Sequence, residues 1–141
     1  MAKETGQYLT VAARGLPLAI PLGQVQEVVL WVPWEEGPPG TPGLVGVVDV
    51  RGESWPVWDL ARRWGWNPRD PGVESCYVLM NDPDGNRLGA VIVDRIGWII
   101  EGEAREYDRS RGGAGLHFSR TIRDPETNAE HYVTTLSELT D

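Results

Sequence analysis

Three aspartates could supply acid–base chemistry, because Asp49, Asp59 and Asp94 each lie at or near the end of an apolar run. Two carboxyl groups that converge in a cleft, with pKa values shifted apart, can act as general acid and base in hydrolysis. Such a pair would need a separation of roughly 5–9.5 Å. Aspartates at strand ends more often cap turns or pair with an arginine, and Arg51 and Arg95 lie close by. A small β-barrel hydrolase using these carboxylates is therefore kept only as an alternative to a non-enzymatic protein.

Metal and thiol chemistry find little support in the sequence. The run DPDGN at 82–86 resembles the start of a calcium loop, but glycine is missing from the sixth position and a carboxylate from the twelfth, so a hairpin turn is expected. Cys76 opens the apolar run CYVLM and is expected to be a buried small hydrophobic residue rather than a reactive thiolate. His117 and His131 lie fourteen residues apart without a metal-ligand motif. We therefore expect no metal and no cofactor.

Composition indicates one acidic domain. The chain has 141 residues, with 21 acidic side chains against 13 Lys and Arg, and a formal net charge of −8. Phosphate backbones repel such a charge, so nucleic acid is not an expected partner. A single cysteine excludes an internal disulfide, and no apolar run reaches the ~18–20 residues of a membrane-spanning helix. The opening MAKETGQYL lacks a signal-peptide stretch, so we expect a cytoplasmic protein without membrane insertion.

Short apolar runs separated by turns fill the chain, and 17 glycines with 11 prolines disfavour long helices. Val, Ile and aromatic residues dominate these runs, as in strands. We predict strands at 8–13, 16–21, 25–32, 44–50, 54–58, 76–81, 88–93, 98–100 and near 131–136. Short helical turns are predicted at 59–64 and 137–139, and irregular loops at 35–43, 67–72 and 103–119. GVVDVRG at 46–52 also resembles AVIVDRIG at 90–97, which fits two similar halves. The pattern predicts an all-β barrel or sandwich.

Ordered motifs over residues 6–140 resemble the CheW-like domain of bacterial chemotaxis signalling. VQEV at 25–28 is similar to the family's V-x-E-V segment. LVGVVDVRGESWPVWDL at 44–60 resembles a G-V-x-N-L-R-G followed by P-V-x-D-L, with Asp49 and Val50 in place of the asparagine and leucine. RLGAVIVDRI at 87–96 resembles the family's G-x-x-V-D-x-V.

This resemblance implies a single domain over 6–140 with an all-β fold: two intertwined five-stranded SH3-like barrels with one or two short helices. The first barrel would cover mostly 16–66 and the second mostly 74–120, with the termini completing them. The family's adaptors bind the regulatory domain of a CheA-type histidine kinase on one barrel. They bind the helical tip of methyl-accepting chemoreceptors in or beside the groove between the barrels. The resemblance therefore implies a non-enzymatic chemotaxis adaptor, and a scaffold of a type IV pilus, twitching-motility or gene-regulatory pathway is the nearest alternative.

The resemblance also marks candidate kinase- or receptor-binding positions, which are Val25, Glu27, Gly46, Arg51, Tyr77 and Gly89. The residues themselves allow structural interpretations as well. Val25 could be core, Gly46 and Gly89 could permit a bulge or a close backbone approach, and Arg51 could pair with Asp49 or Asp59.

Four tryptophans lie in or near the predicted strands of the first barrel, namely Trp31, Trp34, Trp55 and Trp58. Tryptophan is enriched at the energetic centres of protein interfaces. We therefore expect at least one of the four to be exposed at a contact surface.

Overall fold

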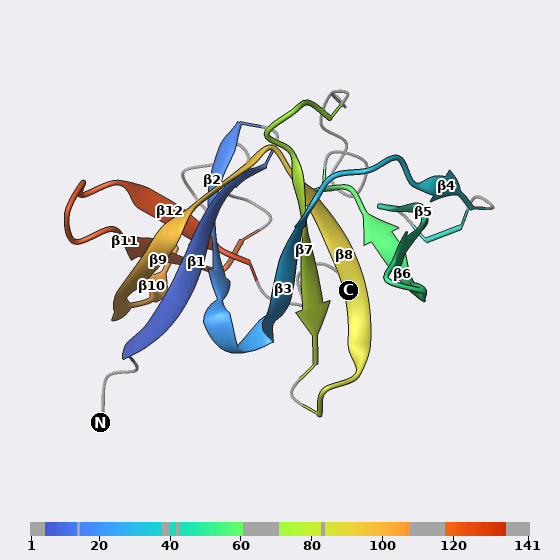
Figure 1. Cartoon of the computed structure of the whole chain (residues 1–141). Helices are drawn as coiled ribbons and strands as arrows, with labels where there is room; N and C mark the ends of the chain where they lie inside the picture. Colours follow the sequence, from blue (N-terminus) through green and yellow to red (C-terminus); the bar gives the residue numbers. More distant parts are fainter. Residues whose placement is uncertain are drawn as a thin grey trace.

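Most of the described part of the chain forms β-strands (Figure 1). The computed structural model describes residues 5–13, 15–37, 40–41, 43–60, 71–82, 84–107 and 118–134. The first elements are β1 (Thr5–Ala13), β2 (Leu16–Pro21), the 3-10 turn η1 (Leu22–Gln24), β3 (Val25–Leu30), β4 (Glu35–Glu36), β5 (Leu44–Val50) and β6 (Glu53–Trp58). They are followed by β7 (Cys76–Asn81), β8 (Arg87–Val93), β9 (Arg95–Glu103), β10 (Arg105–Glu106), β11 (Arg120–Arg123) and β12 (Glu130–Val133).

The strands form two six-stranded sheets with the same connectivity. One has the order β9-β1-β2-β12-β11-β10, and the other has the order β3-β7-β8-β6-β5-β4. In each sheet every pair of neighbouring strands is antiparallel except one. The parallel pair is β2 with β12 in the first sheet and β6 with β8 in the second. The hairpin β1–β2 therefore corresponds to β7–β8, and β9–β12 correspond to β3–β6. The chain starts the first sheet, builds the whole of the second, and returns to finish the first.

Each sheet is rolled around its own apolar cluster. Val29 of β3 and Val48 of β5 lie far apart in the sheet order, yet both pack in the same cluster. Ile100 of β9 and Ile122 of β11 do the same in the other sheet. The two sheets lie side by side, with β1, β2 and β9 to β12 on the left of Figure 1 and β4 to β6 on the right.

A third cluster joins the two sheets. Along β7, Cys76, Val78 and Met80 enter this shared cluster, whereas Tyr77 and Leu79 point into their own sheet's cluster. Successive side chains of a strand point to opposite faces, so burial of both faces requires an unbroken apolar run. This explains why CYVLM has no polar residue, and why the central hairpins hold the two halves together.

The predicted all-β fold is confirmed, and the predicted strands at 16–21, 44–50 and 76–81 coincide with β2, β5 and β7. The prediction missed β4, β10 and β11, and it made β9 too short. The two-residue strands β4 and β10 are polar and owe their conformation to pairing with β5 and β11, which local sequence does not reveal. Residues 61–64 of one predicted helix and all of 137–139 lie outside the described residues.

The strands divide between the sheets differently from the predicted barrels at 16–66 and 74–120. β7 and β8 join β3 to β6, whereas β2 joins β1 and β9 to β12. The parallel contact between β6 and β8 and the antiparallel contact between β3 and β7 account for this arrangement. The two-residue strands β4 and β10 stand at the ends of the two orders, beyond five longer strands in each sheet.

Candidate functional site

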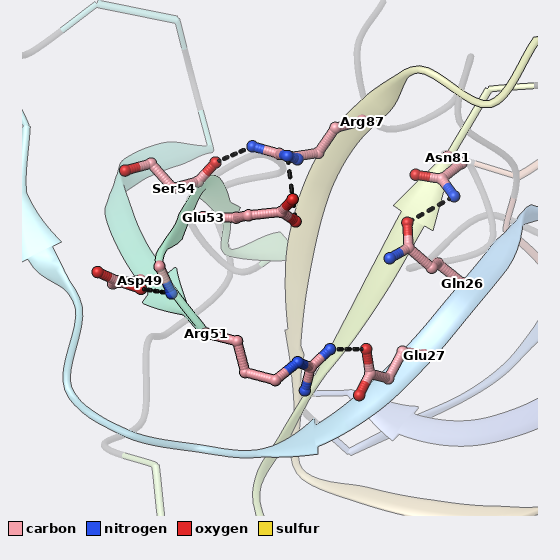
Figure 2. A network of polar contacts seen from close by, with 9 residues as sticks. Gln26, Glu27, Asp49, Arg51, Glu53, Ser54, Asn81 and Arg87 are labelled. Atoms are coloured by element: carbon pink, nitrogen blue, oxygen red, sulfur yellow. Dashed lines mark hydrogen bonds and ion pairs between the residues drawn. The ribbon is translucent and has the colours of Figure 1, made fainter.

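An ion pair joins the edge strand β3 to the turn between β5 and β6 across the rolled β3–β8 sheet. The line between β3 and this turn is called the seam below. Arg51, in the turn between β5 and β6, donates from Nη2 to Oε1 of Glu27 on β3 (Figure 2). This hydrogen bond lowers the pKa of Glu27 and raises the pKa of Arg51. The Arg51 side chain is 65% exposed and that of Glu27 32% exposed, so both face solvent. The pair joins the edge strand β3 to the β5–β6 turn and places two opposite charges together on the surface.

The turn that presents Arg51 has a constrained backbone. Val50 pairs with Glu53, which leaves a two-residue loop of Arg51 (φ 51°) and Gly52 (φ 83°). Two positive φ values are typical of a type I′ hairpin turn, which favours Asn-Gly or Gly-Gly rather than an arginine at the first position. Oδ1 of Asp49 accepts the Gly52 N–H at 2.7 Å. The sequence-based pairing of Arg51 with Asp49 or Asp59 is therefore wrong, because Asp49 caps the turn and Arg51 reaches β3.

Further polar contacts hold this hairpin against β8. Nη1 of Arg87 donates to the Ser54 carbonyl at 2.8 Å, and Nη2 lies 3.2 Å from Oε2 of Glu53 (Figure 2). The Arg87 guanidinium also lies 4.9 Å from the centre of the Trp55 ring, within the range of a cation–π contact. These contacts orient the hairpin on which Arg51 sits.

Val25 and Glu27 lie on either side of a register shift in the pairing of β3 with β7. Bulges of this kind change the direction in which the following side chains point. Val25 is half-buried and packs against the shared cluster, as its interpretation as a core residue anticipated. Glu27 instead reaches the seam, so the structure brings Glu27 together with Arg51 and leaves Val25 beneath the surface between the sheets.

The two candidate glycines allow close packing. A Cβ atom on Gly46 would lie 2.0 Å from the carbonyl oxygen of Glu35, and one on Gly89 would lie 2.4 Å from Cδ1 of Trp58. Both glycines are buried. Gly46 therefore permits β4 to lie against β5, and Gly89 permits the Trp58 indole to lie across β8.

Tyr77 is completely buried, and its hydroxyl donates to the carbonyl oxygen of Val32. Burial raises the pKa of Tyr77 to about 12. A side chain with no exposed surface cannot contact a partner directly, which corrects its assignment as a contact residue. Tyr77 instead ties the segment that follows β3 to the interior of the sheet.

An apolar stripe on β3 and just beyond its end was not identified from the sequence. Val28, Leu30 and Val32, called the apolar stripe below, are 37%, 73% and 49% exposed. Val28 pairs with Val78 and Leu30 with Cys76, and both of these β7 side chains enter the shared cluster. Val28 and Leu30 therefore lie on the face of the sheet that carries the shared cluster, at an edge where this face is exposed to solvent. The sequence VQEVVLWV is apolar at these alternate positions, but it does not show that β3 lies at the edge of its sheet.

The expectation of an exposed tryptophan among the four predicted ones is wrong. Trp55 and Trp58 are buried, and Trp31 and Trp34 are half-buried against the cluster of the β3–β8 sheet. Among the described residues the exposed tryptophan is Trp98 on β9, at 54%, and its Nε1 donates to Oδ2 of Asp124 at 2.8 Å. Indole side chains are large enough to fill the interior of the β3–β8 sheet, which explains why these tryptophans are buried or half-buried.

The three aspartates of the hydrolase alternative do not meet in one place. Asp49 lies at the β5–β6 turn, whereas Asp59 follows the other end of β6, five residues and roughly 17 Å beyond Ser54, the residue that pairs with Asp49. Asp59 is buried, and Oδ2 of Asp94 accepts the Gly15 N–H at 3.1 Å. The structure therefore separates Asp49 from Asp59 along β6 and places Asp94 against a backbone N–H group.

The remaining chemical candidates occupy structural positions. Oδ1 of Asp82 accepts the N–H groups of Asp84 and Asn86, which confirms the predicted hairpin turn. Cys76 is buried, as predicted, and burial raises the pKa of its thiol. Within the described ranges, no three His, Cys, Asp or Glu side chains are grouped to hold a metal ion. None of the helices in those ranges is long and apolar enough to cross a membrane.

Comparison with known proteins agrees with this architecture. The family model of the CheW-like domain matches residues 7–122. Among solved structures, the chain is similar to the scaffolding protein TtCheW from Thermoanaerobacter tengcongensis, with a TM-score of 0.75, 16% sequence identity, and coverage of 94% of this chain and 85% of that chain. This likeness confirms the fold that the sequence motifs implied. No curated protein matches the chain in sequence.

Proposed function

The chain belongs to the CheW-like domain family, and on that premise we propose that it is a non-enzymatic adaptor that couples chemoreceptors to a CheA-type histidine kinase. It would do so as a single domain in the cytoplasm. Family members of this type bind the regulatory domain of the kinase and the helical tip of the receptor. The adaptor would hold both proteins at a set spacing and change no covalent bond.

The observation that carries this proposal is the conformation of Arg51. A non-glycine residue with positive φ is uncommon, and such outliers concentrate at functional sites. A glycine or asparagine would suit the type I′ turn better. The arginine is exposed and lies in the family's most specific motif, so we infer that it serves recognition rather than folding.

Glu27 and Arg51 form the proposed contact surface, and the half-buried Val25 supports β3 from beneath it. In this proposal Gly46, Gly89 and Tyr77 act indirectly, because they shape the strands beneath that surface. The two-sheet architecture supports the role of a rigid adaptor, since both halves share one core and cannot move independently without exposing it.

Calorimetry with purified proteins tests this proposal. The wild-type chain is expected to bind the regulatory domain of a chemotaxis kinase, and Arg51→Ala to bind it or the receptor fragment at least tenfold more weakly, because charged interface anchors of this kind cost about 1.4 kcal/mol or more when removed. Parallel titration with the kinase of a type IV pilus system identifies the pathway. Wild-type protein that binds neither kinase nor a receptor fragment would refute the adaptor role.

A further inference from the structure

A cavity of about 280 Å³ lies at the end of the first sheet where the β1–β2 hairpin turns. Gly15, in that turn, borders the cavity, and Arg95, Trp98 and His131 contribute to its walls. The volume is close to the lower limit of roughly 300 Å³ for small-molecule sites. A ligand built around a single ring would therefore be of suitable size.

The strand registers place four of the lining residues in one row across the sheet. Arg95 on β9 pairs with Ala12 on β1, and Ala12 pairs with Pro17 on β2. Continued by one residue, the parallel pairing of β12 with β2 sets His131 beside Pro17. Directly opposed residues point to the same face of a sheet. The row therefore has a cation at one end, an imidazole at the other and two small side chains between them.

This row faces the interior of the first sheet. Ala19 and Val133 belong to that sheet's own cluster, and Pro17 and His131 precede them by two residues. Side chains two residues apart on a strand share a face. The sheet is rolled so that β9 and β11 contact the same cluster, which brings the ends of the row toward each other across the cavity.

The second sheet fills the corresponding place with an indole. Val133 on β12 and Val57 on β6 each pair with a buried alanine in the parallel contact of their sheet, so Trp55 is the counterpart of His131. Trp55 is 1% exposed, and the Arg87 guanidinium lies 4.9 Å from the centre of its ring. The second half thus shows what this end of a sheet accommodates, which is an aromatic ring with an arginine against it.

Two polar groups in the cavity wall are available to a ligand. Among the described residues, no carboxylate pairs with the Arg95 guanidinium. Nδ1 of His131 lies 3.2 Å from the Ala129 carbonyl oxygen, which can only accept, so Nδ1 carries the proton and Nε2 of the neutral ring is an acceptor. Within the described ranges, no hydrogen bond reaches this Nε2. The cavity therefore offers a donor fork and an acceptor at opposite ends of a small apolar floor.

We propose that this cavity binds a small aromatic carboxylate that carries a hydroxyl group opposite its carboxyl group. The carboxylate would pair with Arg95, because a guanidinium can form two parallel hydrogen bonds with it. The ring would lie over Ala12 and Pro17, and the hydroxyl would donate to Nε2 of His131. The inference goes beyond the proposed function, since it assigns a small-molecule site in the half of the chain that does not contain the proposed contact surface.

Titration of the full chain with para-hydroxyphenylacetate tests the site. Calorimetry should show saturable one-to-one binding, and the indole N–H signal of Trp98 should shift in a proton–nitrogen correlation spectrum with the same dependence on concentration. Phenylacetate, which lacks the hydroxyl, should bind several-fold more weakly. Tyrosol, which has an alcohol in place of the carboxylate, should bind about tenfold more weakly, because hydrogen bonds between charged groups are the stronger ones.

Variants at both ends of the row test the assignment. Arg95→Gln should weaken binding about tenfold, whereas Arg105→Gln, at an exposed arginine on β10 of the same sheet, should bind like the wild type. His131→Phe keeps a ring but removes the acceptor, so it should bind para-hydroxyphenylacetate and phenylacetate equally. His131→Trp copies the second half and should abolish binding by filling the cavity, with the circular dichroism spectrum unchanged.

The outcomes decide the inference separately from the adaptor role. Absence of saturable binding by the wild-type chain would overturn it, as would equal affinity for tyrosol. Binding that Arg95→Gln and His131→Phe both leave unchanged would also overturn it, and these two variants suffice if His131→Trp does not fold. None of these results would alter the affinity of the chain for a kinase or a receptor fragment, which tests the adaptor role independently.

Discussion

Arg51 pairs with Glu27 across the seam of a rolled sheet, although three strands separate β3 from β5 in the sheet order. The contact depends on a type I′ turn that places the arginine in a left-handed backbone conformation. It depends equally on a register shift in β3 that precedes Glu27. Two local departures from regular strand geometry therefore produce one exposed pair of charges.

The variant Arg51→Asn should be more stable than the wild type yet bind its partner more weakly. Asparagine adopts positive φ more readily than arginine, so the turn would lose strain. Thermal unfolding should show a higher melting temperature, and calorimetry with the kinase domain and the receptor fragment should show reduced affinity. Higher stability with unchanged affinity for both would mean that Arg51 has no part in recognition.

Exchanging the charges, with Glu27→Arg and Arg51→Glu together, should keep the fold but lose partner binding. The exchanged pair can still form the seam contact, whereas a partner would meet each charge in the wrong place. Circular dichroism and calorimetry measure the two properties. If the exchanged variant binds like the wild type, the pair acts only by joining the strands.

Asp124 should make stability depend on acid pH. Its Oδ1 accepts the Glu126 N–H at 2.8 Å, and this bond, helped by the Trp98 indole, lowers the pKa of Asp124. A carboxylate with a lower pKa in the folded state stabilises the fold above its unfolded pKa, and that contribution is lost as pH falls through the folded pKa. Asp124→Asn should flatten this decline in denaturant unfolding between about pH 5 and pH 2. Asp84→Asn changes net charge equally and should retain the wild-type decline.

Tyr77 should make stability depend on alkaline pH. Because burial raises its pKa to about 12, the hydroxyl stays protonated in the folded chain where an unfolded tyrosine already ionises. The stabilising effect is complete below about pH 10, where the unfolded tyrosine begins to ionise. It is lost as pH rises to about 12. Tyr77→Phe should lower stability at neutral pH by about 0.5–1.5 kcal/mol, since the bond to Val32 disappears. An identical alkaline decline in both proteins would contradict this assignment.

Alanine at Gly46 or Gly89 should destabilise the chain by about 1–3 kcal/mol, as overpacking of a filled interior does. Each added Cβ would lie within 2.4 Å of a neighbouring atom, from the Glu35 carbonyl or the Trp58 ring. Gly23→Ala is the matched control, because no atom lies within 4 Å of its added Cβ. Chemical denaturation measures all three variants. Gly89→Ala with the stability of Gly23→Ala would show that Trp58 moves aside without cost.

Strands can be predicted from this sequence where burial on both faces determines which residue types they contain. The run CYVLM was correctly predicted as a strand, β7. Both faces of β7 are buried, which favours an apolar sequence without interruption. β4 and β10 could not be predicted, since their two-residue polar segments become strands only by pairing with β5 and β11. The likeness of 46–52 to 90–97 does not correspond to the structural repeat, because β5 is related to β11 and β8 to β2. The chain order of the two halves is permuted, which hides the repeat from a linear search.

The candidate site was predictable in part. The motifs identified Glu27 and Arg51, but not their contact, because it depends on how far the sheet rolls. Tyr77 and Gly89 were placed near a contact surface and proved to be interior. The apolar stripe was read as ordinary strand, since nothing in VQEVVLWV tells an edge strand from a central one.

In its proposed role, this chain holds a receptor and a kinase together. Analytical ultracentrifugation of the chain with a chemoreceptor cytoplasmic fragment and the regulatory domain of the kinase tests it most directly. We expect a ternary species in which all three proteins sediment together, and we expect Arg51→Ala to abolish it. A mixture in which receptor and kinase exclude one another from the adaptor, leaving only binary species, would contradict it.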